Sequence, residues 1–386
     1  MTRLFTSPLV ILLLGTSALP LRAQLDAPDG IIRLEEIQKP KQRKLLNIPS
    51  VNGHQALKCD FHMHTVFTDG HVWPNVRVQE AWQEGLDAFA FTEHVEYAPH
   101  KADVTEDVSR SYELAKDLAK DNKLTLIKGV EITRDTPPGH FNALFIGDTS
   151  GYVADRSQAR DKEAIEKAVA QNAFIFWNHP GWKAREIKGS YEWTPFVDEL
   201  FRENKLHGIE VANGHGIHVK AIDWALDRNL TIIGNSDIHN LVAHEYDLDR
   251  YDGHRTMTLV FAKDSSPDAI REALQAGRTV AWAGKYLIGK EDHVRGLFEA
   301  SVSLKPSHSS RPDRSGKVQK FYELVNDSDL CFDLALKKGR GPRVLKLQPS
   351  SSLLVSAQEG ANELVYEVTN TLIRSDKHLN VSFRLK

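Results

Sequence analysis

Short apolar runs separated by longer amphipathic segments fill the chain from Lys58 to about Ala283. Each run has the length of a strand, and most are followed by a stretch with the helical spacing of apolar residues. After the run that begins at Lys58, the expected strands are DAFAFTEH ending at His94, LTLIKGVEIT ending at Thr133, HFNALFIG from His140, AFIFWNHP ending at Pro180, HGIEVAN ending at Asn213, LTIIGNSDIH ending at His239 and TMTLVFA ending at Ala262. Helices are expected over residues 74–85, 103–121, 158–171, 219–228 and 267–277. This alternation predicts an α/β fold with a parallel sheet, and seven or eight such units predict closure into a barrel.

A different pattern follows residue 290. Residues 305–317, KPSHSSRPDRSGK, are rich in proline, serine and charge, which is typical of a loop or linker. Beyond them come FYELVN, CFDLAL, SLLVSA, ELVYEV and NVSFRL, short alternating stretches with turn residues between them. They predict a small antiparallel β-domain. We therefore expect a barrel over residues 58–290 and a β-rich C-terminal domain over residues 291–386.

The N-terminus has the pattern of a secretory signal peptide. Arg3 precedes an apolar run from Val10 to Leu14, and a cleavage site is expected after Ala23. The run is interrupted at residues 15–17 and is short for a membrane span, and no second stretch approaches spanning length. We expect residues 1–23 to be removed and residues 24–57 to lead into the barrel. The mature protein is expected to be periplasmic or secreted, with no membrane span.

The overall charge indicates no nucleic-acid partner, since 49 basic residues are balanced by 52 acidic ones. The sequence leaves the oligomeric state open. Only two cysteines occur, Cys59 and Cys331. An exported destination permits a disulfide between them, although Cys59 opens an apolar strand, where a small buried thiol is the commoner role. The 17 histidines are more informative.

Histidines and carboxylates gather at the expected strand ends. In CDFHMHTVFTDGH, His62 and His64 lie two apart on an extended stretch, so both side chains point to the same side. Asp237 and His239 repeat that spacing after a later strand. In an α/β barrel the C-terminal strand ends meet on one face, which brings such residues together. The candidates for metal ligands are His62, His64, Asp69, His94, Glu131, His140, His179, Asp237 and His239.

Each of these residues also has an ordinary structural role open to it. His179 before Pro180 is typical of a turn, Glu131 of a buried ion pair, and His140 of a loop. Nine such residues at strand ends together favour a metal site. Imidazoles and carboxylates without thiolates suit zinc, manganese or iron, and nine ligands suffice for two or three divalent ions. Clustered ions of this kind clamp the attacking and leaving oxygens of a phosphoryl displacement.

Six motifs carry a resemblance to a known family. HMHTVFTDG, FTEH, GVEIT, GHFNALF, NHPGW and GNSDIH, over roughly residues 58 to 262, resemble the successive metal motifs of the PHP (polymerase and histidinol phosphatase) superfamily of phosphoesterases. The words around them, together with LVNDSDL in the β-rich tail, are similar to secreted bacterial PHP phosphodiesterases that degrade organophosphate diesters. The resemblance implies a distorted (β/α)7 TIM-like barrel, followed here by the small C-terminal β-domain.

The resemblance also implies a division of the ligands. His62, His64, Glu131 and Asp237 would hold one ion, and Glu131 would bridge to a second ion held by His140 and His179. A third ion would be held by Asp69, His94 and His239. Two positions depart from the family pattern: Glu93 stands where Asp is common, which concerns the support of the ligands, and Asp69 stands where some relatives carry His.

The reaction implied is hydrolysis of a P–O bond by a hydroxide that bridges the ions, whose pKa the metal lowers towards about 7. Arg134 follows Glu131 by three residues and could bind a phosphate oxygen with its fork of donors, or simply pair with an acid. His215 and His218 are candidate acids for the leaving group, and His218, His254 and Arg255 are candidates for binding substrate at the mouth of the site. A structural or solvent-exposed role is open to each of these.

Three classes of function fit the sequence. An exported phosphoesterase acting on a small-molecule phosphoester, most simply a phosphodiesterase, is favoured. A metal-dependent hydrolase of an amide or lactone is the second, because histidine-rich barrels also carry that chemistry. The third is a non-catalytic metal-binding or carbohydrate-binding module, against which the complete set of ligand types argues.

Overall fold

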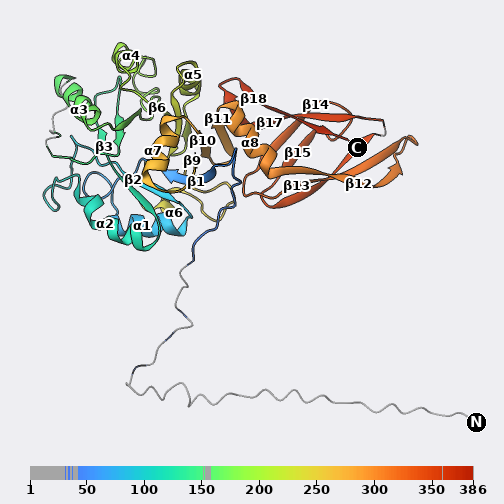
Figure 1. Cartoon of the computed structure of the whole chain (residues 1–386), viewed down its shortest axis with the longest axis horizontal. Coiled ribbons are helices and arrows are strands. Elements are labelled where there is room, and N and C mark those ends of the chain that lie inside the picture. Colours follow the sequence, from blue (N-terminus) through green and yellow to red (C-terminus); the bar gives the residue numbers. More distant parts are fainter. Residues whose placement is uncertain are drawn as a thin grey trace, which may run out of the picture. The chain divides into compact units, whose positions relative to one another are not determined.

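A computed structural model describes residues 42–150, 152, 158–358 and 360–385, together with Ile31, Leu34 and Ile37 (Figure 1). The predicted signal peptide, residues 1–23, lies outside the described residues. The chain divides at Gln42, and the fold described below is that of the unit Arg43–Lys386. In the described part of the chain, no helix combines the length and apolar character needed to cross a membrane.

Seven strands follow one another around the barrel. They are β1 (Gln55–Asp60), β2 (Ala88–Phe91), β3 (Thr125–Ile132), β4 (Phe141–Leu144), β5 (Phe174–Trp177), β6 (Gly208–Asn213) and β8 (Thr231–Asn235). Just beyond β8 and β1, Met63 and Ile238 form an isolated parallel bridge that brings the first and last of these strands together. The backbone N–H of Asp237 donates to the carbonyl of His62 at 2.9 Å in the same place. These contacts thus lie among the expected metal-binding motifs.

One strand of the ring runs against the expected direction. The sequence predicts a parallel sheet, but β4 is antiparallel to both β3 and β5. Phe141, the first residue of β4, pairs with Ile132 and Trp177, the last residues of β3 and β5. The start of β4 therefore lies at the same edge as the ends of its neighbours. This reversal explains why His140, which precedes its strand, can join residues that follow theirs.

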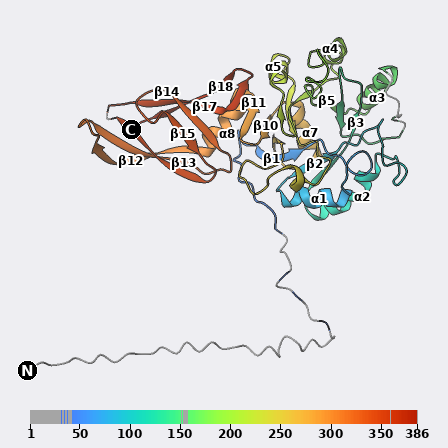
Figure 2. The same ribbon diagram turned by 180° about the vertical axis from the view of Figure 1, so that it is seen from behind.

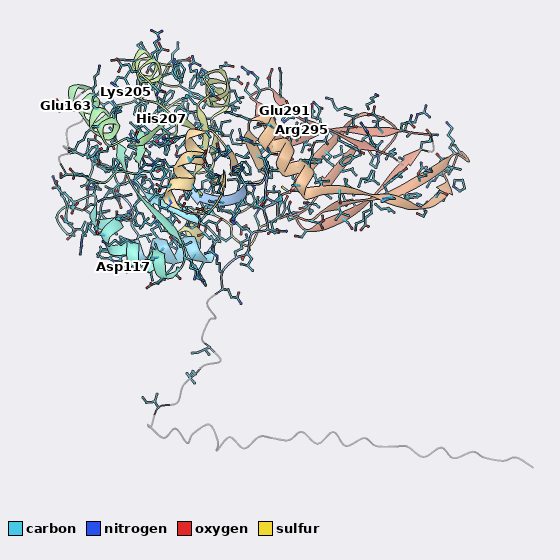
Figure 3. The ribbon with its side chains drawn as sticks, viewed as in Figure 1. Asp117, Glu163, Lys205, His207, Glu291 and Arg295 are labelled. Atoms are coloured by element: carbon cyan, nitrogen blue, oxygen red, sulfur yellow. The ribbon has the colours of Figure 1, made fainter. Side chains whose placement is uncertain are left out.

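Helices lie around the outside of these strands (Figures 1 and 2). They are α1 (Pro74–Gln83), α2 (Arg110–Asp121), α3 (Gln158–Ala170), α4 (Pro195–Arg202), α5 (Val219–Asp227), α6 (Val242–Glu245) and α7 (Pro267–Gln275). A further helix, α8 (Glu291–Ser301), lies beside β11 (Tyr286–Gly289) and β17 (Glu363–Arg374) at the start of the C-terminal domain (Figure 1). Proline opens α1, α4 and α7, and Ser266 caps α7 by accepting from the backbone N–H of Ala269. The sequence predicts all but α4, α6 and α8, and α2 begins later than expected. Charged side chains such as Asp117 of α2 and the paired Glu291 and Arg295 of α8 lie on exposed helix faces (Figure 3).

The barrel sheet continues into the C-terminal domain. The strand β9 (Met257–Ala262) is antiparallel to β1, and β10 (Thr279–Ala283) and β11 (Tyr286–Gly289) extend it. A short strand, β7 (Gly216–Ile217), forms a hairpin with β6. Two residues of β11 then pair in parallel with β17 (Glu363–Arg374) of the C-terminal domain. The two domains are joined by sheet hydrogen bonds as well as by the chain.

The C-terminal domain is antiparallel, as predicted. One sheet has the order β12 (Val302–Pro312), β13 (Val318–Asn326), β16 (Ser351–Gln358), and the other contains β14 (Phe332–Lys338), β15 (Val344–Leu347), β17 and β18 (Lys377–Arg384). The predicted linker at residues 305–317 is wrong, because most of it belongs to β12. Among the described strands, this one pairs only with β13, and it has a bulge between Lys305 and Ser309. An edge strand tolerates the proline and charge that made the stretch read as a loop.

Candidate metal centre

The nine predicted ligands lie together at one end of the barrel. His62, His64 and Asp69 follow β1, His94 follows β2, Glu131 is in β3, His140 precedes β4, His179 follows β5, and Asp237 and His239 follow β8. All nine occur in overlapping groups whose ligand atoms lie within 4.8 Å of one another. The groups are His62 with His64 and Glu131; His62 with His179 and Asp237; His94 with Glu131 and His140; and His64 with Asp69, His94 and His239.

Glu131 and Asp237 are the acids at the centre of the cluster. The Nε2 atoms of His62 and His64 each lie 3.2 Å from Glu131 Oε2, and 3.1 and 3.2 Å from Asp237 Oδ1. Two more imidazoles approach Glu131, with His94 Nδ1 3.0 Å from Oε2 and His140 Nδ1 2.9 Å from Oε1. The position of Glu131 among several imidazoles fits a carboxylate that bridges two ions.

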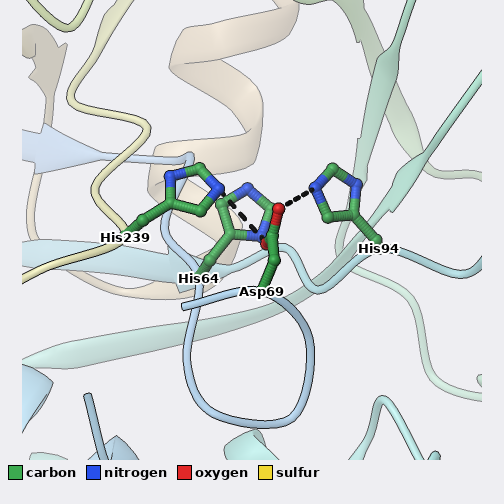
Figure 4. Close-up of side chains that lie close together, drawn as sticks. All are labelled: His64, Asp69, His94 and His239. Atoms are coloured by element: carbon green, nitrogen blue, oxygen red, sulfur yellow. Dashed lines mark ion pairs between the residues drawn. The ribbon is translucent and has the colours of Figure 1, made fainter. Parts of the chain in front are cut away.

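Asp69 has its own pair of histidines (Figure 4). Its carboxylate lies 3.2 Å from His239 Nε2 and 3.4 Å from His94 Nε2. The ring of His64 stacks on both of these imidazoles, with centroids 4.3 and 4.5 Å away. Asp69, His94 and His239, the three residues of the predicted third set, thus lie together, and His64 connects them to the remaining ligands.

Atoms without hydrogen-bond partners indicate that the cluster suits metal ions. Among the described side chains, His62 Nε2, His64 Nε2, Asp69 Oδ1 and Glu131 Oε2 are buried and have no hydrogen bond. Ligands about 2.1 Å from one ion lie roughly 3.0–3.4 Å apart, which is close to the separations observed here. Unpaired buried polar atoms are costly. The donors present therefore fit divalent metal ions.

Hydrogen bonds on the far sides of two rings orient these histidines. His62 Nδ1 lies 2.9 Å from Glu210 Oε1, and His239 Nδ1 lies 2.7 Å from the carbonyl oxygen of Asp237. A carboxylate or carbonyl can only accept, so each Nδ1 carries the proton and each Nε2 presents a lone pair to the cluster. This tautomer is the one that a metal ligand needs.

The electrostatics of the cluster favour positive charge. Burial raises the pKa of Glu131, but His94, His62 and His140 together hold that pKa well below its usual range. Burial lowers the pKa of His64, yet Asp237 and Glu131 outweigh it and raise the pKa to about 10. Ionised carboxylates concentrated in a buried cluster stabilise bound cations, whether protons or metal ions.

Glu210 in β6 is a buried acid that the sequence analysis missed. Besides His62, its Oε1 accepts from Asn235 Nδ2 at 2.8 Å, and its Oε2 accepts from the backbone N–H of His179 at 2.7 Å and from Asn213 Nδ2 at 2.8 Å. His179 needs this anchor, because its φ of 24° lies in the left-handed region. A lone carboxylate inside the apolar run GIEVAN was the available signal.

Glu93 supports the loop that carries Asp69. Its buried carboxylate accepts from the hydroxyls of Thr65 and Thr68, both at 2.5 Å. Gly70 lets this loop fold closely on itself, since a Cβ there would lie 2.8 Å from the backbone of His64 and Thr65. Glu93 therefore helps to place Asp69 in the cluster.

A cavity of about 620 Å³ opens over the cluster. Seven of the predicted ligands line it: Asp69, His94, Glu131, His140, His179, Asp237 and His239. Arg134 and Lys183 bring positive charge to the wall, and the guanidinium of Arg134 stacks on Phe196 with its carbon 3.7 Å from the ring centre. Arg134 is thus placed within the cavity, as a phosphate-binding role requires.

The other predicted site residues lie elsewhere. His215 is exposed and lines a neighbouring cavity of about 430 Å³. His218 Nδ1 accepts from the backbone N–H of Gly181 at 3.3 Å and does not line the metal cavity. His254 is buried, with both ring nitrogens near backbone carbonyls.

Arg255 is fully buried and does not reach the cavity. Its guanidinium donates to both carboxylate oxygens of Glu84, at 2.8 and 2.9 Å, and to Asp60 at 3.1 Å. The predicted positions of His254 and Arg255 at the mouth of the site are therefore corrected. Buried charges are retained in proteins when they are paired, and these contacts give Arg255 a structural role.

The C-terminal domain is similar to a known family. A family model described as an Ig-like domain matches residues 302–384. No sequence among the curated proteins is significantly similar to the chain. Two solved structures match weakly, each with 15% sequence identity. One is a candidate metal-dependent phosphoesterase from Bifidobacterium adolescentis, with a TM-score of 0.36 and a match that covers 48% of this chain and 89% of that one. The other is an amidohydrolase from Chromobacterium violaceum with bound sulfate and no metal, with a TM-score of 0.38 and a match that covers 58% of this chain and 98% of that one.

A crystal structure from Bacteroides vulgatus is far more similar. It is of a two-domain protein containing a predicted PHP-like metal-dependent phosphoesterase, and it is 41% identical to this chain with a TM-score of 0.82. The match covers 90% of this chain and 100% of that one, so both domains correspond. With the clustered histidines and carboxylates at the strand ends, this similarity shows that the chain belongs to the family of PHP-like metal-dependent phosphoesterases.

Proposed function

We propose that this protein hydrolyses a phosphodiester with two or three divalent transition-metal ions, zinc, manganese or iron, bound at the nine-residue cluster. The observation that carries the proposal is the convergence of unpartnered, buried nitrogen and oxygen atoms of His62, His64, Asp69 and Glu131 beneath an open cavity. Membership of a metal-dependent phosphoesterase family supports the same reaction.

The ligand division proposed is the one that the family resemblance implies. His62, His64, Glu131 and Asp237 hold the first ion, and Glu131 with His140 and His179 holds the second. Asp69, His94 and His239 hold the third. The ions would supply a hydroxide nucleophile near neutral pH and neutralise charge on the phosphate oxygens.

The chain's own residues prepare the substrate. Arg134 lies in the cavity wall, where its fork of donors can hold a phosphate oxygen, and Lys183 adds a second positive charge. The base of the cavity is deeply buried around His62, His64 and Glu131, and burial strengthens the attraction between charged groups there. Glu210 and Glu93 keep the ligands oriented before substrate binds.

A diester fits this cavity better than a monoester. A phosphate monoester has only one substituent to contact the wall of the cavity. A diester carries one negative charge and two substituents, for which a cavity of about 620 Å³ has room. We therefore propose a small-molecule phosphodiester as the substrate.

Activity on an ester panel tests the proposal. The mature protein, reconstituted separately with zinc and manganese, is assayed on matched phosphate mono-, di- and triesters and on an amide and a lactone. We expect turnover of the diester to be fastest and to disappear with chelator. Turnover confined to the amide or lactone, or no metal bound after reconstitution, would overturn the proposal.

Export is a separate part of the proposed function. It rests on the leader that ends near Ala23. Mature protein recovered from the periplasm or medium is expected to begin at about Gln24. An N-terminal sequence from that fraction that retains Met1 would contradict this.

A further inference from the structure

An exposed apolar wall stands beside the metal cluster. Trp182, Tyr97 and Ile187 line the cavity, and they expose 54%, 40% and 38% of their surfaces. Large apolar side chains exposed together at a concave site commonly mark a binding surface. None of the three is explained by holding metal or by binding phosphate.

Trp182 lies directly against two of the predicted ligands. Its ring centre is 5.5 Å from that of His140 and 5.4 Å from that of His179. Tyr97 also lines the cavity, and its ring lies 6.0 Å from that of His94 in an edge-on arrangement. A group attached to a phosphate at the cluster would therefore reach these aromatic rings within a few bonds.

The loop that carries Trp182 is fastened in place. The backbone N–H of Trp182 donates to the carbonyl of His179 at 2.9 Å, and that of Ile187 donates to the carbonyl of Lys183 at 2.8 Å. Beneath the loop, Gly181 packs so closely that a Cβ would lie 2.7 Å from His218 Nδ1. His218 thus acts as a positioning residue for this loop. An aromatic ring that is held before binding loses little entropy when a ligand contacts it.

Lys183 sets the character of this surface. Its Nζ lies over the Trp182 ring, 4.4 Å from the centre, so one face of the indole already contacts a cation. The amine also lies beside the cavity, where it can attract a phosphate oxygen of the same ligand. The wall therefore combines an apolar surface with an adjacent positive charge, as an anion with a flat apolar substituent requires.

We infer that the wall of Tyr97, Trp182 and Ile187 selects phosphodiesters in which one ester group is a flat apolar ring, such as an aryl group. This inference rests on the proposed function and names the substrate class of the same site. The ring packs on Trp182 while the phosphate lies at the cluster beside Arg134 and Lys183. Small alkyl diesters would leave Trp182 and Ile187 exposed to water and so bind more weakly.

Binding of two non-hydrolysable probes tests the inference without relying on turnover. Phenylphosphonate and methylphosphonate carry the same anionic group and differ in the ring, and their Kd values are measured by calorimetry on the metal-loaded full-length mature protein. We expect phenylphosphonate to bind about tenfold more tightly, as a single aromatic contact allows. The variant Trp182→Ala should lose most of this preference, and Trp182→Phe should keep much of it.

Two controls separate this contact from damage to the site. Trp73 is also exposed, at 45%, but does not line the cavity, so Trp73→Ala should keep the full preference. Ile187 is not one of the predicted ligands, so Ile187→Ala should reduce the preference with metal content unchanged. This variant covers the case in which Trp182→Ala loses metal.

The outcomes distinguish this inference from the proposed function. If esters are hydrolysed but Trp182→Ala, Trp182→Phe and Ile187→Ala change the two Kd values equally, the wall does not select a ring and the inference is wrong. If no phosphoester is hydrolysed but the ring preference depends on Trp182, the proposed reaction fails while the binding inference stands. Equal binding of both phosphonates to the unmodified protein would also overturn the inference.

Discussion

Glu210 Oε1 lies 2.9 Å from Nδ1 of His62, and the other oxygen of the same carboxylate accepts from the backbone N–H of His179 at 2.7 Å. One buried side chain thus positions two candidate ligands that are far apart in the sequence. Each oxygen also accepts from an asparagine, so all four contacts of this carboxylate are made by donors. Only an ionised acid satisfies such a set.

Glu210→Gln should therefore weaken metal binding without contacting metal. Whichever way the amide is turned, its NH2 group faces donors, so either His62 or His179 loses its support. Loss of such outer contacts typically lowers metal affinity by about 10- to 100-fold. Competition with a chelator of known affinity measures the change. Unaltered affinity in a folded variant would show that Glu210 does not position the ligands.

Arg255→Met tests the structural role of the buried arginine. The change leaves Asp60 and Glu84 without their cation, and breaking a buried pair from one side typically costs about 3–5 kcal/mol in the free energy of unfolding. Denaturation by urea measures this cost. Arg250→Met is the matched control, since Arg250 is 61% exposed and pairs with Asp252 at the surface, where about 1 kcal/mol or less is expected.

A substrate-binding role for Arg255 predicts the opposite pattern. The stability of Arg255→Met would then match that of the parent protein, and KM for the diester would rise. Such a result would restore the interpretation drawn from the sequence.

The local sequence was sufficient to predict which side chains cluster at the strand ends, but not which residues support them. The two-residue spacing of His62 and His64 fixes a shared direction on an extended chain, and barrel topology brings strand ends together. Arg255 has no comparable local pattern, because its partners Asp60 and Glu84 are 195 and 171 residues away. Glu210 looks the same as Glu131 in sequence, a carboxylate in an apolar strand. Only their different neighbours in space separate the two roles.

Strand direction was the other feature that the pattern could not provide. Apolar periodicity in HFNALFIG predicts a strand, but says nothing of which way it pairs. The short connection from β3 to β4 allowed an antiparallel neighbour, as the pairing of Ile132 with Phe141 shows. In β12, proline and serine suggested a loop because edge strands tolerate residues that central strands exclude.

The two cysteines should be free and unreactive in the folded protein. Both are thiols in the structure, and burial raises the pKa of each, that of Cys331 to about 12. Since the thiolate is the reactive form, iodoacetamide at about pH 8 should modify neither residue. After denaturation without reductant, mass spectrometry should detect two modifications. Two unmodified cysteines under those conditions, released only by reductant, would reveal a disulfide.

Glu131→Gln should abolish most activity while the fold survives. The proposed bridging role needs two anionic oxygens, and the amide removes the negative charge that offsets repulsion between two cations. It also turns an NH2 group towards either the imidazoles or Asn178, whose Nδ2 now donates to Glu131 Oε1 at 2.9 Å. Diester turnover should fall by orders of magnitude and metal content should drop, with the far-UV circular dichroism unchanged.

His215→Ala provides the contrast to that loss. The ring of His215 lies in the neighbouring cavity, 4.6 Å from the ring of Tyr246, and not over the cluster. A general acid typically contributes about 10²- to 10⁴-fold, so a loss below that range would agree with its observed position. A loss within it would assign the leaving-group proton to His215.

The bridging role of Glu131 would be contradicted by a Glu131→Gln protein that keeps its full metal content and near-normal turnover.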